Sequence, residues 1–175
     1  MRFTLSSEHV RSTTFTDEHG QVVYKSDTPF GLGSRSTKLH KTTSHGLRHQ
    51  STTVGSIEWH TYSSTILRFD GSKVKTKDFI PSSGFLKKKR TFVGPDGHSY
   101  RWELESRVVV LYLNATPKVE MARFHRRSLG IIGHKREPYL EVSSQVEHIL
   151  DLVILTFIYV EKIRMDKEKA SHTAT

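Results

Sequence analysis

The chain has 175 residues, a length typical of one domain, with 35% hydrophobic and 26% charged residues. Its formal net charge of +9 favours anionic partners, although a basic protein without an anionic ligand has the same charge. The absence of cysteine excludes disulfides, thiolate metal sites and cysteine nucleophiles, and it favours a reducing intracellular location, the cytoplasm. Residues 1–9 lack the apolar core of a signal peptide, as expected for such a location.

Short β-prone segments separated by turns fill the first two thirds of the chain. The predicted strands cover residues 13–16, 21–25, 37–41, 57–60, 65–69, 73–75, 91–93, 100–104, 108–113, 119–125 and 129–135. Glycine-containing turns join three pairs of them, at Asp17–Gly20, Asp70–Gly71 and Gly94–Gly97. Residues 31–53 are rich in Ser, Thr, Gly and His, so we expect a loop there with only the short strand 37–41.

The C-terminal part of the chain has a different pattern. From Ile149 to Val160 only Asp151 and Thr156 are polar. Apolar side chains therefore surround this segment, as in a helix that is buried on all sides. The run of 12 residues is shorter than the about 20 that a membrane-spanning helix needs, so no transmembrane span is expected.

A capping pattern precedes this apolar run. Ser144 and Glu147 have the spacing of a capping box, which predicts a helix over about residues 145–167. The β-branched residues of the run also permit a strand, but its length and the capping box favour a helix. We expect the polar residues 170–175 to form a disordered tail.

These elements together predict a mainly β fold. A helix that is apolar on all sides cannot lie on one face of an open sheet without exposing its far side to water. A closed antiparallel β-barrel around the helix buries it completely and also removes unpaired edge strands. The prediction is one domain over residues 1–169, a closed barrel that encloses one hydrophobic C-terminal α-helix.

Six segments also carry a recognisable pattern: Ile57–His60, Phe69–Gly71, Asp78–Pro81, Arg90–Gly97, Tyr100–Trp102 and Thr156–Lys162. Together they resemble an uncharacterised domain family that is common in mushroom-forming fungi, over roughly residues 15–164. That family looks like a member of the tubby C-terminal-like group, which includes phospholipid scramblases and plant LURP-one-related proteins. The resemblance implies an antiparallel barrel of about twelve strands around a central helix. Tubby proteins bind phosphoinositide headgroups and scramblases act on lipids, but the resemblance assigns no lipid-binding positions here.

Positive charge is concentrated in residues 35–136, which hold 20 Lys or Arg against 7 Asp or Glu, a net charge of +13. The candidate anion-binding residues form a dense run and a second cluster: Lys87, Lys88, Lys89 and Arg90, then Arg123, Arg126 and Arg127. Such side chains bind phosphate through charge-assisted hydrogen bonds. The alternative is that they are solvated strand ends, which keep sheet edges from aggregating.

Patterns typical of metal and catalytic sites are weak. His40, His45 and His49 lie close in the sequence, but neither a cysteine nor a His-Glu-x-x-His pattern accompanies them. We therefore expect neither a metal nor another cofactor. Glu58 and His60 share one face of a predicted strand, where such a pair is more typical of a surface contact than of catalysis. No spacing selects a catalytic triad.

The predicted function is a binding or interaction module for an anionic ligand, with phospholipid or phosphoinositide headgroups as candidates and peripheral contact with a membrane. Two alternatives remain open: an enzyme of unknown chemistry with a pocket at one barrel mouth, and a structural protein-interaction domain. A deep pocket with convergent residues of shifted pKa would favour the enzyme, and a shallow basic patch the lipid-binding module. The charge is also compatible with nucleic acid, but no recognised binding motif is present.

Overall fold

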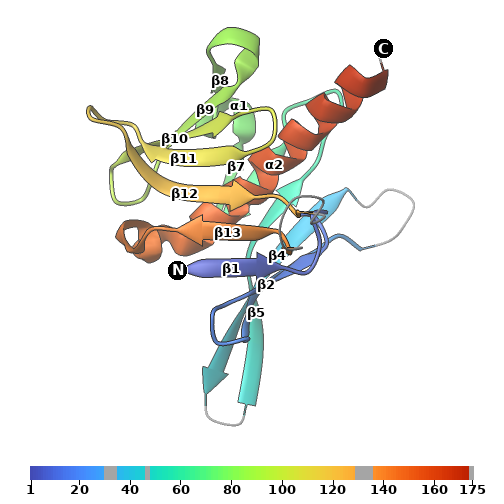
Figure 1. Ribbon diagram of the computed structural model, residues 1–175, viewed down its shortest axis with the longest axis vertical. Coiled ribbons are helices and arrows are strands. Elements are labelled where there is room, and N and C mark those ends of the chain that lie inside the picture. The colour runs from blue at the N-terminus through green and yellow to red at the C-terminus, as the bar shows by residue number, and fades with distance from the viewer. Residues whose placement is uncertain (30–34, 46–47, 129–135, 174–175) are drawn as a thin grey trace.

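The computed structural model describes residues 1–29, 35–45, 48–128 and 136–173, without the side chains of residues 44, 45, 48 and 49. In this part of the chain, thirteen strands form one antiparallel sheet that curves around a long C-terminal helix (Figure 1). The strands are β1 (Arg2–Leu5), β2 (Thr13–Thr16), β3 (Val22–Asp27), β4 (Ser36–His45), β5 (Arg48–Glu58), β6 (Ile66–Phe69), β7 (Ser72–Lys75), β8 (Ser82–Ser83), β9 (Lys89–Val93), β10 (Ser99–Leu104), β11 (Val109–Leu113), β12 (Val119–His125) and β13 (Tyr139–Val142). The helices are α1 (Thr76–Phe79) and α2 (Leu150–Thr173), with 3₁₀ turns η1 (Phe85–Lys87) and η2 (Ser144–Ile149).

The sheet consists of two meanders. β1 to β7 form the first and β8 to β13 the second, and the pairing of β1 with β13 joins them. β7 and β8 are the two edges, and within the described residues no ladder connects them. The predicted closed barrel is therefore wrong, although the mainly β antiparallel fold with one C-terminal helix is confirmed.

Side-chain packing spans the opening between the two edges. β7 has four residues and β8 has two, and α1 lies between them in the chain. Phe79 of α1 lies between Phe69 of β6 and Phe92 of β9, with ring centroids 5.1 and 5.8 Å apart. Ile80, which follows, is fully buried. The connecting segment thus shields the core at the opening, so burial of α2 does not require a closed ladder.

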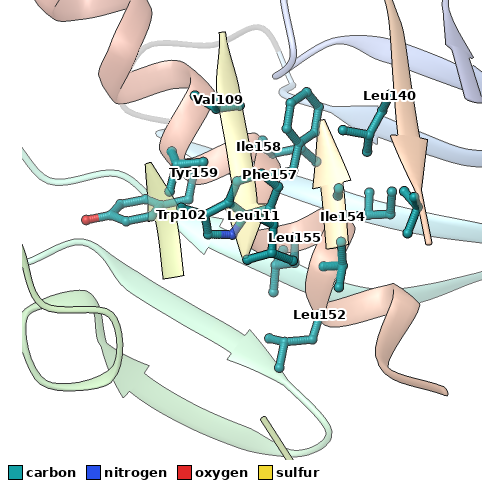
Figure 2. Close-up of a cluster of buried hydrophobic side chains, with 14 of the residues drawn as sticks. Trp102, Val109, Leu111, Leu140, Leu152, Ile154, Leu155, Phe157, Ile158 and Tyr159 are labelled. Carbon is teal, nitrogen blue, oxygen red and sulfur yellow. The ribbon is translucent and has the colours of Figure 1, made fainter. Parts of the chain in front are cut away.

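The apolar part of α2 is buried as predicted, because strands surround it. Six apolar residues of the run predicted to be buried are at most 5% exposed: Ile149, Leu152, Val153, Leu155, Phe157 and Val160. Figure 2 shows Trp102 of β10 and Leu111 of β11 beside Phe157 of the helix. The Trp102 indole nitrogen donates a hydrogen bond of 3.1 Å to Thr156 Oγ1, so this buried polar residue has a partner.

The helix boundaries differ from the prediction at both ends. Ser143 is the N-cap of the 3₁₀ turn η2, which precedes α2. Its Oγ accepts a hydrogen bond of 3.3 Å from the Gln145 backbone nitrogen. The backbone of Val146 is non-helical, with φ −113° and ψ 16°, so α2 begins only at Leu150. At the other end the helix continues to Thr173, so residues 170–173 are helical rather than disordered.

The predicted loop at residues 31–53 is also wrong in its described part. β4 and β5 form a long hairpin with pairs from Ser36–Glu58 to His45–Arg48, which extends away from the body of the molecule (Figure 1). Many of its residues are threonines, whose β-branched side chains favour paired strands over a loop. The strand predicted over 129–135 lies outside the described residues.

Candidate anion-binding site

The loop between β8 and β9 carries the first basic cluster and projects from one end of the molecule, at the top of Figure 1. We call residues 84–88 the β8–β9 tip. Leu86 and Lys87 have φ of 57° and 52°, the left-handed region that residues with side chains rarely adopt. Phe85 is 88% and Leu86 60% exposed. The tip therefore presents two apolar side chains next to its lysines.

The basic run does not form a single patch, because neighbouring residues of a strand point to opposite faces. Lys89 is exposed and lies opposite Glu103 of β10 in the sheet register. Arg90 shares the inner face with buried Phe92, and its Cζ lies 5.9 Å from the centroid of the Tyr159 ring of α2. The Arg90 Nε is buried and has no hydrogen-bond partner among the described residues. Arg90 is thus an inward-facing cation near the tip.

Lys167 of α2 joins these residues, although it lies 80 residues along the chain from Lys87. Its Nζ donates hydrogen bonds to the carbonyl oxygens of Leu86 (2.9 Å) and Lys87 (3.1 Å). Burial lowers the pKa of the Lys167 ammonium, and the charges of Arg90, Lys88 and Lys87 lower it further. Sequence reasoning missed Lys167 because nothing in its neighbourhood in the sequence marks this contact.

We call Lys87, Lys88, Arg90 and Lys167 the tip cluster. In the part of the chain that the structure describes, none of these four side chains forms an ion pair with a carboxylate. Their positive charges are close enough to depress the pKa of Lys167. The tip cluster is therefore a concentration of positive charge without an internal counterion.

The second predicted cluster is placed differently. Each guanidinium is paired with a carboxylate: Arg123 with Glu120 at 2.6 Å, Arg126 with Glu168 at 2.9 Å, and Arg127 with Glu137 at 2.7 Å. The hydrogen bonds that Arg123 donates to Glu120 and Arg127 donates to Glu137 raise the pKa of each arginine. These three arginines line a hollow of about 530 Å³ together with Arg107, but Glu8 and Glu168 line it too. Their role in binding an external anion stays a prediction.

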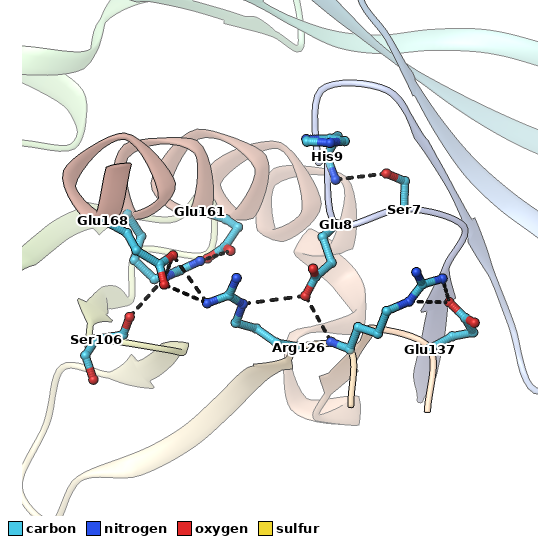
Figure 3. Close-up of polar contacts among 10 residues, drawn as sticks. Ser7, Glu8, His9, Ser106, Arg126, Glu137, Glu161 and Glu168 are labelled. Carbon is cyan, nitrogen blue, oxygen red and sulfur yellow. Dashed lines mark hydrogen bonds and ion pairs between the residues drawn. The ribbon is translucent and has the colours of Figure 1, made fainter. Parts of the chain in front are cut away.

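Arg126 belongs to a chain of ion pairs that starts from α2 (Figure 3). Arg164 of α2 is buried and forms a two-bond pair with buried Glu161, with both distances 2.8 Å. Arg164 also contacts Glu168 at 3.0 Å, and Arg126 extends the chain from Glu168 to Glu8. This network attaches the C-terminal half of α2 to Arg126, which follows β12, and to Glu8, which follows β1.

A carboxyl group with a clearly lowered pKa, Asp96, lies outside the arginine-lined hollow. Asp96 Oδ2 accepts hydrogen bonds from the Tyr100 hydroxyl (2.6 Å) and from His148 Nε2 (2.7 Å). Burial raises the pKa of Asp96, but these bonds and that of the His98 backbone nitrogen outweigh it and bring the pKa to about 2. The hollow lined by Arg107 contains none of these groups. Arg123, Arg127 and Glu168, which line that hollow, also have shifted pKa values, and each of them is held in an ion pair within the protein.

The other candidate sites have structural explanations. Arg68 pairs with Glu58 at 2.7 Å, while His60 is 4.0 Å from the same carboxylate, so this is a surface contact as predicted. The described residues contain no group of three or more His, Asp or Glu that would hold a metal, and the side chains of His45 and His49 lie outside them. Of the helices described, none is long and apolar enough to cross a membrane.

The fold and the site define a mainly β protein whose curved antiparallel sheet surrounds one helix and carries a basic tip that has no carboxylate partner among the described residues. A family model described as a family of unknown function, DUF6593, matches residues 8–166, and the chain belongs to this family. Searches of curated proteins and of solved structures found no match.

Proposed function

We propose that this protein is a non-enzymatic binding module whose tip cluster takes up a ligand carrying phosphate groups, with phospholipid or phosphoinositide headgroups as candidates. The observation that carries this proposal is the absence of any carboxylate partner for Lys87, Lys88, Arg90 and Lys167 in the described chain, whereas Arg123, Arg126 and Arg127 are all paired. Phosphate oxygens accept charge-assisted hydrogen bonds from such groups and would reduce their mutual repulsion.

The strength of this attraction sets the kind of ligand. Each Lys or Arg near an anionic surface contributes about 1 kcal/mol, so Lys87 and Lys88, the two exposed lysines of the tip, contribute about 2 kcal/mol. This is weaker than millimolar affinity, so binding requires a ligand with several phosphate groups or a surface with many headgroups. We therefore favour a multivalent anion over a single inorganic phosphate ion.

We also propose that the chain is related to the tubby C-terminal-like group and to the fungal domain family that its sequence resembles. The curved antiparallel sheet around a hydrophobic C-terminal helix supports this relationship, although the sheet is open. Such a relationship agrees with phosphoinositide headgroups as ligands, but the assignment rests on the tip cluster rather than on the resemblance. The intracellular, cytoplasmic location stays a prediction.

Titration calorimetry with inositol hexakisphosphate tests the proposal. We expect binding at low salt that fades as the Debye length falls from about 10 Å at 0.1 M to about 3 Å at 1 M ionic strength. Lys87→Ser/Lys88→Ser should abolish it without unfolding the protein, because both side chains are exposed. The matched control Lys25→Ser/Lys38→Ser removes two exposed lysines on β3 and β4 and should retain binding. No binding by the wild type at low salt, or equal loss in both double variants, would contradict the proposal.

A further inference from the structure

We propose that the β8–β9 tip docks on an anionic phospholipid bilayer by inserting Phe85 and Leu86 between the lipids, while Lys87 and Lys88 contact the headgroups. This inference rests on the proposed function, because it assumes that the tip cluster binds phosphate. It adds the physical state of the ligand, a membrane surface, and a role for the two apolar side chains.

The first observation is the exposure of two adjacent apolar residues. Phe85 is 88% and Leu86 60% exposed, at the end of a loop that projects from the molecule (Figure 1). Single exposed apolar residues are ordinary on protein surfaces. Here two of them are consecutive and precede three lysines. This arrangement of apolar residues beside basic ones is typical of segments that lie in a membrane interface.

The second observation is the hydrogen bonding of the tip backbone. A loop that enters an apolar medium must leave few peptide groups unpaired. Lys167 donates to the carbonyl oxygens of Leu86 and Lys87, and the Lys87 backbone nitrogen donates to Gly84 O at 3.1 Å. The carbonyl oxygen of Lys88 accepts from the Leu104 backbone nitrogen at 2.8 Å. Five backbone polar groups of the tip, one N–H and four carbonyl oxygens, are therefore satisfied before any contact with lipid.

The third observation is charge. A protein partner would need a dedicated surface to match both the apolar pair and the lysines. An anionic bilayer presents phosphates at its surface and acyl chains beneath them, so it matches both without such a surface. Lysine stems extend their ammonium groups towards the headgroups while the neighbouring apolar residues lie deeper. The tip cluster has no internal carboxylate partner among the described residues, so its charge remains available to such a surface.

Cosedimentation with phosphatidylcholine vesicles, with and without phosphatidylserine, tests the insertion. We expect wild type to bind only the vesicles with phosphatidylserine. Phe85→Ser/Leu86→Ser should reduce this binding about tenfold or more, because the apolar area that enters the lipid is lost. The control Val22→Ser/Val93→Ser removes two apolar residues that are 41% and 58% exposed elsewhere, and it should bind like wild type. Thermal unfolding followed by circular dichroism checks that both variants are folded.

Two further measurements separate this inference from the proposed function. Phe85→Ser/Leu86→Ser should still bind inositol hexakisphosphate, whereas Lys87→Ser/Lys88→Ser should lose both ligands. In Phe85→Trp, vesicles with phosphatidylserine should shift the emission of the new tryptophan to the blue. Unchanged vesicle binding by Phe85→Ser/Leu86→Ser overturns the insertion. Binding of inositol hexakisphosphate by wild type without any vesicle binding overturns the membrane proposal and leaves the proposed function standing.

Discussion

Asp151 and Thr156, the two polar residues within the apolar part of α2, each bind a strand residue. Asp151 accepts hydrogen bonds from the Tyr24 hydroxyl and from Lys41 Nζ, the latter at 2.9 Å. Thr156 accepts from the Trp102 indole. These contacts link the helix to three different strands, so the two residues align the helix within the sheet while the apolar residues supply the burial.

Asp96 makes the stability of the protein depend on pH in the acid range. Its pKa in the folded protein is about 2, below the usual value of 3.8. Its contribution to stability is therefore fully present above pH 3.8 and is lost as the pH falls through 2. Because its partner side chains His98 and His148 are 64% and 53% exposed to water, we expect this contribution to be about 1 kcal/mol. Urea unfolding between pH 7 and pH 2 measures it.

The matched variant for this prediction is Asp96→Asn, which keeps the size of the side chain but cannot ionise. It should be less stable than wild type at pH 7, and the difference should shrink as the pH falls towards 2, where the wild-type carboxylate becomes protonated. A difference that stays constant from pH 7 to pH 2 would show that the ionised carboxylate adds no stability.

At the scale of elements, α2 supplies much of the hydrophobic core. Deletion of residues 144–175 removes the buried side chains from Val146 to Val160 and leaves the inner face of the sheet without its partner. We expect the shortened protein to lose cooperative thermal unfolding, followed by near-UV and far-UV circular dichroism. A cooperative transition that survives this deletion would argue against a core built on α2.

Deletion of residues 170–175 is the control for this truncation. Residues 170–173 continue α2 but are exposed, so their removal costs little buried area. The thermal midpoint of this variant should stay near that of the wild type. The comparison separates the buried part of the helix from its solvent-exposed end.

At the scale of the whole molecule, we expect the sheet to open locally most easily between its two edge strands, β7 and β8. Both edge strands are short, and each is hydrogen-bonded to a neighbour on one side only. We expect amide hydrogens of β7 and β8 to exchange faster than those of β11 and β12, which have partners on both sides. Hydrogen exchange followed by mass spectrometry or NMR measures this directly.

Phe79 should control how often this opening widens. Phe79→Ala removes the ring between Phe69 and Phe92, and we expect it to destabilise the protein by about 2 kcal/mol and to speed exchange in β7 and β8. Phe85→Ala, which removes a ring that is 88% exposed, should change neither. Equal exchange in the two variants would mean that Phe79 does not hold the edges together.

Much of the secondary structure could be predicted from local pattern. Strand-forming side-chain patterns predict two of the strands, Thr13–Thr16 and Val119–His125. Turn chemistry predicts the turn at Gly94–Gly97. Both kinds of signal act between near neighbours in the sequence. The burial of α2 follows from the composition of its surface alone. β1 and β13 were missed because each is short and is stabilised by pairing with the other across most of the chain.

The sequence by itself determined that a strand-rich chain encloses an apolar helix, because hydrophobic burial depends on which side chains are apolar and how they are spaced. Only the tertiary structure decided that the sheet is open, that Lys167 meets the β8–β9 tip, and that Arg126 is paired while Lys87 is not. These features depend on distances between residues far apart in the chain. The packed fold therefore decides which charges form ion pairs and which strand edges pair with each other. The burial of α2 and the turns follow instead from patterns among near neighbours in the sequence.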